Sequence, residues 1–186
     1  PSNYLTVLGM ADSKHKLGQL EQAIDLYDRA EKLNENDAEL YYNRGIAYVF
    51  LEEFGKAIRD FNQSEKLRPD QAQLYYYRGY AQAALSRYKN AIADYSKALD
   101  LKPDYAEAYY NRGAAKAELD NYEAGMEDFQ TALEKKPDLE NGKINIALSK
   151  LGLKQYQAAI DGLTEIIDER AENLARAYFY RGEAYY

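Results

Sequence analysis

The chain has 186 residues, no cysteine, and 31 acidic against 24 basic side chains, for a formal net charge of -7. The lack of cysteine excludes disulfides, thiolate metal sites and thiol catalysis, and the negative charge disfavours nucleic-acid partners because no basic stripe offsets it. No apolar run approaches the roughly 18 residues that span a bilayer, so we expect no membrane span. The composition leaves the compartment open.

The sequence repeats itself with a step of 34 residues. This step separates three glycines, three prolines and three tyrosines: Gly45, Gly79 and Gly113; Pro69, Pro103 and Pro137; Tyr41, Tyr75 and Tyr109. Self-similarity at a fixed period of about 20–50 residues is typical of stacked repeats. We therefore expect complete repeats at residues 4–37, 38–71, 72–105, 106–139 and 140–174, and the first helix of a sixth repeat at 175–186.

Each repeat is predicted to form two helices. In residues 38–51, apolar and small residues recur about three or four positions apart, which is the pattern of one helical face. The residues "EEF" then turn the chain, and residues 55–68 supply a second amphipathic helix. Pro69 ends it, because proline cannot continue a helix. We expect the small residues Gly45 and Ala57 where the two helices cross closely.

This pattern resembles the tetratricopeptide repeat family, whose unit of about 34 residues combines aromatics, a glycine, an alanine and a final proline. In the second repeat the matching residues are Tyr41, Gly45, Tyr48, Ala57, Phe61 and Pro69. The resemblance covers essentially the whole chain, more loosely in the first and fifth repeats. It implies one all-α domain over residues 1–186, a right-handed superhelical solenoid of antiparallel helix pairs with the first helices on the concave face. We expect the chain to be a fragment of a longer protein.

An arginine and an aspartate recur together at fixed places in the repeat. The arginine is the seventh residue and the aspartate follows sixteen positions later, which gives the pairs Arg44 and Asp60, Arg78 and Asp94, Arg112 and Asp128. In the first and fifth repeats neither charge is present: Met10 and Ile146 replace the arginine, and Leu26 and Gly162 the aspartate. The pattern predicts an ion pair between the two helices, since removing one partner would strand a buried charge. The alternative is that these arginines hold a ligand carboxylate, and Arg181 has no aspartate sixteen residues on.

The predicted concave wall is rich in tyrosine and asparagine, and we expect it to bind a peptide segment of a partner. Tyrosine gives a large contact area with few rotors, and asparagine can pair with both backbone groups of a peptide. The candidate peptide-binding residues are Glu39, Tyr42, Asn43, Ile46, Phe50, Gln73, Tyr76, Tyr77, Tyr80, Glu107, Tyr110, Asn111 and Asn145, and the ribbon also holds Ala114, Glu118, Ile144, Leu148, Phe179 and Tyr180. Tyr76, Tyr77 and Tyr110 are the expected anchors, with Asn43 and Asn111 holding the peptide backbone. The alternative is that tyrosine is merely a residue that tolerates solvent on this face.

Carboxylates outnumber cations near this wall, so we expect a partner of basic or neutral apolar character. Members of the family that clamp acidic chaperone tails use a concave set of lysine, asparagine and arginine. Here the corresponding positions of the first repeat hold Leu8 and Asp12. An acidic-tail binder is therefore not expected.

We expect no catalysis, no cofactor and no metal site. A nucleophilic triad needs a base, and the only histidine, His15, is expected to be a solvated surface residue. These grounds favour a non-catalytic protein–protein interaction scaffold. Two alternatives stay open: a structural module that self-assembles through its C-terminal end, where Tyr178, Tyr185 and Tyr186 lie, or the repeat section of a longer enzyme or multidomain protein.

Overall fold

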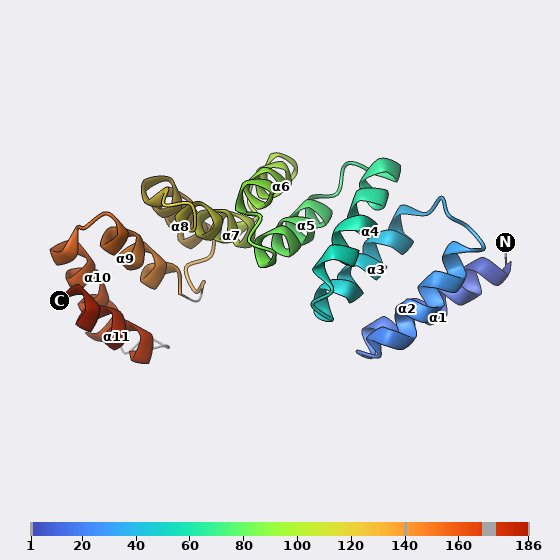
Figure 1. Cartoon of the computed structure of the whole chain (residues 1–186), viewed down its shortest axis with the longest axis horizontal. Coiled ribbons are helices and arrows are strands. Elements are labelled where there is room, and N and C mark those ends of the chain that lie inside the picture. The colour runs from blue at the N-terminus through green and yellow to red at the C-terminus, as the bar shows by residue number, and fades with distance from the viewer. Residues whose placement is uncertain (1, 140, 169–173, 186) are drawn as a thin grey trace. The chain divides into compact units, whose positions relative to one another are not determined.

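The structure is a computed structural model that describes residues 2–139, 141–168 and 174–185. Within these ranges it contains eleven helices and no strand (Figure 1). The helices are α1 Ser2–Lys16, α2 Leu20–Glu31, α3 Ala38–Phe50, α4 Phe54–Leu67, α5 Ala72–Ala84, α6 Tyr88–Leu101, α7 Ala106–Ala117, α8 Tyr122–Lys135, α9 Gly142–Gly152, α10 Tyr156–Asp168 and α11 Leu174–Ala184. The all-α array of helix pairs is confirmed, and the two helices expected in the second repeat end within one residue of their predicted bounds.

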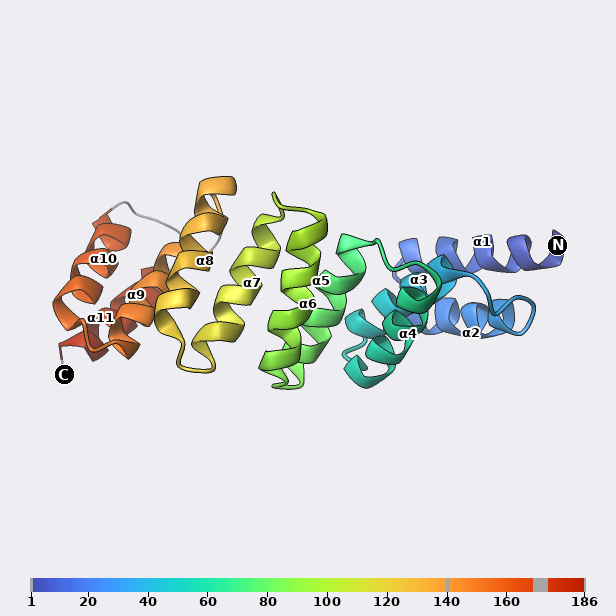
Figure 2. The same cartoon turned by 90° about the horizontal axis from the view of Figure 1, so that it is seen from above.

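The chain divides into two compact bodies, which we describe separately. The N-terminal body, residues 1–101, contains α1–α6, and the C-terminal body, residues 102–186, contains α7–α11. Within each body consecutive helices pack side by side, joined by short turns (Figure 2). The expectation of a single domain stays a prediction. No described helix is both long enough and apolar enough to cross a membrane.

The two helices of a repeat cross where the first of them carries glycine. A Cβ atom added at Gly45 would lie 2.8 Å from the Phe61 ring, and one added at Gly79 would lie 2.9 Å from the Tyr95 ring. These rings are almost completely buried, so the glycines allow a close approach between α3 and α4 and between α5 and α6. This is the role that the sequence assigned to the repeated glycine.

The turn between the two helices has a left-handed backbone at the fifteenth residue of every complete repeat. The φ angles are 71° at Gly18, 58° at Glu52, 56° at Ser86, 58° at Asp120 and 60° at Lys154. Glycine adopts this conformation without cost, whereas other residues lose about 1–2 kcal/mol there. The neighbouring helices therefore impose the turn, because three of its five residues, Glu52, Ser86 and Lys154, are poorly suited to it.

Candidate functional site

Arg44 and Arg78 are buried, and each holds an aspartate with two hydrogen bonds. In the N-terminal body, Arg44 donates from Nε to Asp60 Oδ2 at 2.7 Å and from Nη2 to Asp60 Oδ1 at 2.9 Å. Arg78 holds Asp94 in the same way, at 3.0 and 2.7 Å. The bidentate geometry is the strongest that an arginine makes with a carboxylate. The aspartates are those that the sixteen-residue spacing pairs with these arginines.

The third arginine nitrogen bonds to the preceding repeat, which the sequence analysis missed. Arg44 Nη1 donates to Asp28 and to Glu31 of α2, both at 2.7 Å. Arg78 Nη1 donates to Asn62 at 2.8 Å and also to Glu65, both in α4. Each of these arginines therefore ties together three helices from two repeats. A signal was present in the sequence, because Glu31 and Glu65 are themselves 34 residues apart.

Burial and hydrogen bonding shift the pKa of the arginines in these clusters in opposite directions. Burial opposes the charged form of Arg44 and Arg78, but the hydrogen bonds that they donate to the carboxylates outweigh it and raise the pKa of both guanidinium groups. Hydrogen bonds from the arginines lower the pKa of Glu31 and Glu65, which lie closer to solvent. Each nitrogen of the two guanidinium groups thus donates to at least one acceptor of the protein itself. This geometry favours the structural interpretation of the arginines over the ligand-binding one.

In the C-terminal body, the arginine of α7 makes the same internal pair. Arg112 donates to Asp128 of α8 at 2.8 and 2.7 Å, and Lys116 adds an ion pair with Asp128 at 2.8 Å. Arg181 of α11 differs: its guanidinium lies over the Tyr178 ring, and Nη1 is 3.4 Å from the Thr164 hydroxyl. Thr164 occupies the same repeat position as Asp28 and Asn62.

The tyrosines at the fifth repeat position are partly buried rather than open on the wall. The rings of Tyr42, Tyr76 and Tyr110 lean on the buried aromatics of the paired helix, with centroid distances of 6.2 Å to Phe61, 6.0 Å to Tyr95 and 5.5 Å to Phe129. Burial raises the pKa of Tyr42 to about 12. These tyrosines therefore support the packing and also border the surface.

The other candidate wall residues fall into two groups by exposure. Asn43, Ile46, Tyr77, Glu107, Asn111 and Asn145 are half-buried, whereas Glu39, Phe50, Gln73 and Tyr80 are exposed. Ile144 lies elsewhere, because its side chain is buried in the core formed by α9, α10 and α11.

Several of these polar groups already bond within the protein. Asn43 donates to Asp12 at 3.1 Å, and Asn145 donates to the Tyr110 hydroxyl at 2.8 Å. Lys136 pairs with Glu107 at 2.9 Å, and the hydrogen bond from Lys136 lowers the pKa of Glu107.

An aromatic pocket of about 290 Å³ lies in the N-terminal body, where the turn after α3 meets α5. We define it by its lining residues: Val49, Phe50, Glu52, Phe54, Tyr76, Tyr77 and Tyr80. Phe50 is 64% exposed and Tyr80 is 45% exposed. Tyr80 packs edge-on against Phe54 with ring centroids 6.2 Å apart. The expected wall residues Phe50, Tyr76, Tyr77 and Tyr80 are thus brought together around one cavity.

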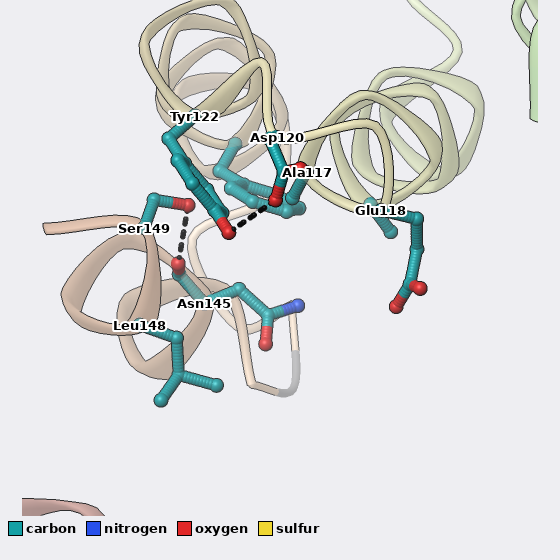
Figure 3. A pocket seen from close by; sticks show the side chains of 9 residues that line it. Ala117, Glu118, Asp120, Tyr122, Asn145, Leu148 and Ser149 are labelled. Atoms are coloured by element: carbon teal, nitrogen blue, oxygen red, sulfur yellow. Dashed lines mark hydrogen bonds between the residues drawn. The ribbon is translucent and has the colours of Figure 1, made fainter. Parts of the chain in front are cut away.

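An acidic pocket of about 360 Å³ lies in the C-terminal body, where the turn between α7 and α8 meets α9 (Figure 3). We define it by Ala114, Ala117, Glu118, Asp120, Tyr122, Phe129, Asn145, Leu148 and Ser149. Figure 3 shows Glu118 on one side of the opening and Asn145 with Leu148 on the other. The Tyr122 hydroxyl donates to Asp120 at 2.7 Å, and this bond raises the pKa of Tyr122. Of these lining residues, the sequence analysis proposed Asn145 as a peptide-binding residue and placed Ala114, Glu118 and Leu148 on the same wall.

His15 is half-buried, so the expectation of a solvated surface histidine is wrong. Its ring packs edge-on against Tyr27 and Phe50, with both centroid distances at 6.4 Å. Burial lowers the pKa of His15, and the charge of Asp12 opposes this shift. Among the described residues, no group of three or more histidine, aspartate or glutamate side chains is arranged to hold a metal ion.

Repeated helix pairs, close glycine crossings and arginine ties define an all-α helical-repeat protein. Models of the family agree: the model described as "TPR repeat" matches residues 11–51 and 83–120, and the one described as "Tetratricopeptide repeat" matches residues 38–71 and 106–139. The chain belongs to the tetratricopeptide repeat family. Proteins of this family bind proteins or peptides and generally act as non-catalytic scaffolds.

Solved structures share the fold at low sequence identity. MamA from Desulfovibrio magneticus RS-1 superposes with a TM-score of 0.86 and 22% identity, over 93% of this chain and 98% of that one. YrrB, described as "a TPR protein with an unusual peptide-binding site", gives a TM-score of 0.85 and 22% identity, over 95% and 90% of the two chains. A curated relative, the BBSome complex member BBS4 of Bos taurus, is 42% identical over 48 residues, which are 26% of this chain. This chain covers 9% of that relative's length.

Proposed function

We propose that this protein is a non-catalytic interaction scaffold that binds a peptide segment of a partner on the wall lined by tyrosine and asparagine. The aromatic pocket carries the proposal. Phe50 and Tyr80 leave large aromatic surfaces in contact with water, and together with Tyr76 and Tyr77 they surround a cavity. Aromatic anchors in pockets supply most of the energy of many interfaces. The solved structure of YrrB, a protein of similar fold described as having a peptide-binding site, adds support.

The proposal is tested by selecting peptides from a random library on the full chain and measuring their dissociation constants by fluorescence anisotropy. We expect affinities on the order of micromolar. The double variant Phe50→Ala/Tyr80→Ala should weaken binding at least about tenfold, since truncated hot-spot residues cost about 2 kcal/mol or more. Phe50 and Tyr80 are better targets than Tyr76 and Tyr110, whose rings also support the core.

The matched control is Tyr156→Ala in α10, which removes a tyrosine of comparable exposure, 52%, from a second helix. It should leave binding unchanged, and circular dichroism should show that both variants are folded. Equal affinity of the wild type and the Phe50→Ala/Tyr80→Ala protein would contradict the proposal, as would a failure to select any peptide.

A second candidate function is self-association through α11. Tyr178 and Phe179 are 52% and 61% exposed, and Tyr185 just beyond the helix is 71% exposed. Such a cluster fits an interface between copies of the chain. Sedimentation at rising concentration tests it: a mass that grows with concentration, and that Tyr178→Ser/Phe179→Ser abolishes, would support this role. A constant monomer mass would exclude it.

A further inference from the structure

The aromatic pocket and the acidic pocket occupy the same place in two different repeats. Glu52 and Asp120 are both the fifteenth residue of their repeats. Each pocket is closed by the ninth residue of the following repeat, Tyr80 in α5 and Leu148 in α9. The same structural position therefore forms a cavity in each of the two bodies, and each body shows it independently.

Both pockets carry exposed carboxylates. Glu52 and Asp120 stand in the left-handed turn, each with φ of 58°, and both are exposed. Glu118 adds a second carboxylate to the acidic pocket. None of the described residues that line either pocket is lysine, arginine or histidine, and none of these three carboxylates forms an ion pair within the described parts of the chain.

The walls of the pockets suit the stem and head of a long cationic side chain. Aromatic faces attract ammonium and guanidinium groups, and the aromatic pocket has five rings: Phe50, Phe54, Tyr76, Tyr77 and Tyr80. In the acidic pocket, Ala114, Ala117 and Leu148 offer apolar surface against which methylene groups can pack. Either volume holds roughly ten water molecules at about 30 Å³ each, which is ample for one such side chain.

Other occupants fit less well. An anion would meet one or two like charges in a protein whose net charge is already -7. A neutral apolar side chain would remove water from the carboxylates without giving them a counter-charge, which costs free energy. A cation on an apolar stem pairs with the carboxylate through its charge and packs against the walls of the pocket through its stem.

We propose that each of these two pockets takes a lysine or arginine side chain of the bound partner. This inference rests on the proposed function, because it names the chemistry that the scaffold recognises. The carboxylate at the fifteenth repeat position pairs with the cation, and the adjoining aromatic or aliphatic wall packs against its stem.

The test uses the full chain, a fragment probe and backbone amide shifts recorded by nuclear magnetic resonance. The probe is n-propylguanidinium, which copies the arginine side chain, and the comparison is the neutral isostere n-propylurea. We expect saturable shifts around Glu52 and around Asp120 with the cation and not with the urea. Glu52→Gln should weaken the first site about tenfold or more, because a hydrogen bond to a charged group contributes about 1.5–3 kcal/mol. Asp120→Asn combined with Glu118→Gln should do the same at the second site.

Each pocket serves as the control for the other, since a substitution in one body should leave the other site intact. Asp25→Asn and Glu127→Gln remove exposed carboxylates from α2 and α8 and should change neither site. Asparagine tolerates the left-handed turn, so Asp120→Asn keeps the backbone. Equal shifts with the urea, or unchanged affinity in the pocket variants, would overturn the inference.

The fragment test separates this inference from the proposed function. If selected peptides bind the aromatic wall but the guanidinium probe does not bind the pockets, the scaffold function stands and the inference fails. If no peptide is selected and the probe still binds both pockets, the proposed function fails while the chemistry of the pockets is supported.

Discussion

At the scale of single residues, Arg78 shows how one side chain supports two repeats. Its guanidinium joins Asp94 within its own repeat to Glu65 of the preceding one. The Asp94 side chain is 11% exposed and the Glu65 side chain is 35% exposed. The two ion pairs therefore differ in how much water screens them.

We predict that Asp94→Asn lowers the free energy of unfolding by about 3 kcal/mol, because it removes the buried counter-charge of the Arg78 guanidinium and leaves only the partly exposed Glu65. Glu65→Gln should cost less than about 1 kcal/mol, as is usual for a pair near solvent. Urea denaturation of the two variants measures both values. Equal losses of unfolding free energy in the two variants would show that the different burial of Asp94 and Glu65 does not affect their contribution to stability.

His15 gives a pH-dependent prediction. Burial lowers its pKa in the folded protein, so the unfolded chain binds a proton more readily, and stability falls as the pH drops below about 6.5. The substitution His15→Gln removes this pH-dependent contribution to stability. The difference in unfolding free energy between pH 7.5 and pH 5.5 should therefore be smaller in the variant than in the wild type. An identical difference in both proteins would argue against a neutral His15 in the folded protein.

At the scale of helices, the glycines predict opposite effects of the same substitution. Gly79→Ala places a Cβ atom 2.9 Å from the Tyr95 ring and should cost about 1–3 kcal/mol. Gly113→Ala should cost at least as much, because the Cβ would lie 2.9 Å from the backbone oxygen of Gly125, which cannot rotate away. Gly9→Ala in α1 meets nothing within 4 Å and should stabilise the protein by about 0.5–1 kcal/mol. Thermal denaturation of the three variants provides the test. If all three substitutions raised the melting temperature, helix propensity rather than close packing would determine the effect of these glycines.

The helices themselves were predictable from the sequence, and the reasons for the misses are physical. A step of 34 residues gives the position of each helix, and the absence of both charges from two repeats suggests that Arg44 and Asp60 act together. The contact of Arg44 with Asp28 requires knowing how far an arginine reaches between stacked repeats, which the pattern within one repeat does not contain. The burial of Tyr42 was missed for a similar reason: a helical projection gives a direction but not the size of the neighbouring Phe61 ring.

The pockets were only partly predictable. Phe50, Tyr76, Tyr77 and Tyr80 were expected on one wall from their spacing. Glu52 was not, because a residue in a turn has no helical phase, and its place follows from the left-handed backbone.

At the scale of the whole molecule, the net charge of -7 should make recognition depend on salt. We predict that a selected peptide carrying lysine or arginine binds several-fold more weakly at 0.5 M than at 0.05 M sodium chloride, because ions screen exposed charges. A selected peptide without charge should bind equally well in both. Anisotropy titrations at the two salt concentrations provide the comparison, and a salt-independent affinity for the basic peptide would count against charge recognition.

The left-handed turn has a consequence for how the array can diversify. Gly18, Glu52, Ser86, Asp120 and Lys154 all adopt it, so the array forms this turn with five different side chains. A mutation at this position changes the chemistry at the edge of a repeat without repacking a helix. The fifteenth residue of each repeat can thus be substituted while the turn keeps its conformation. A series of such substitutions would change the partner preference of the array one repeat at a time.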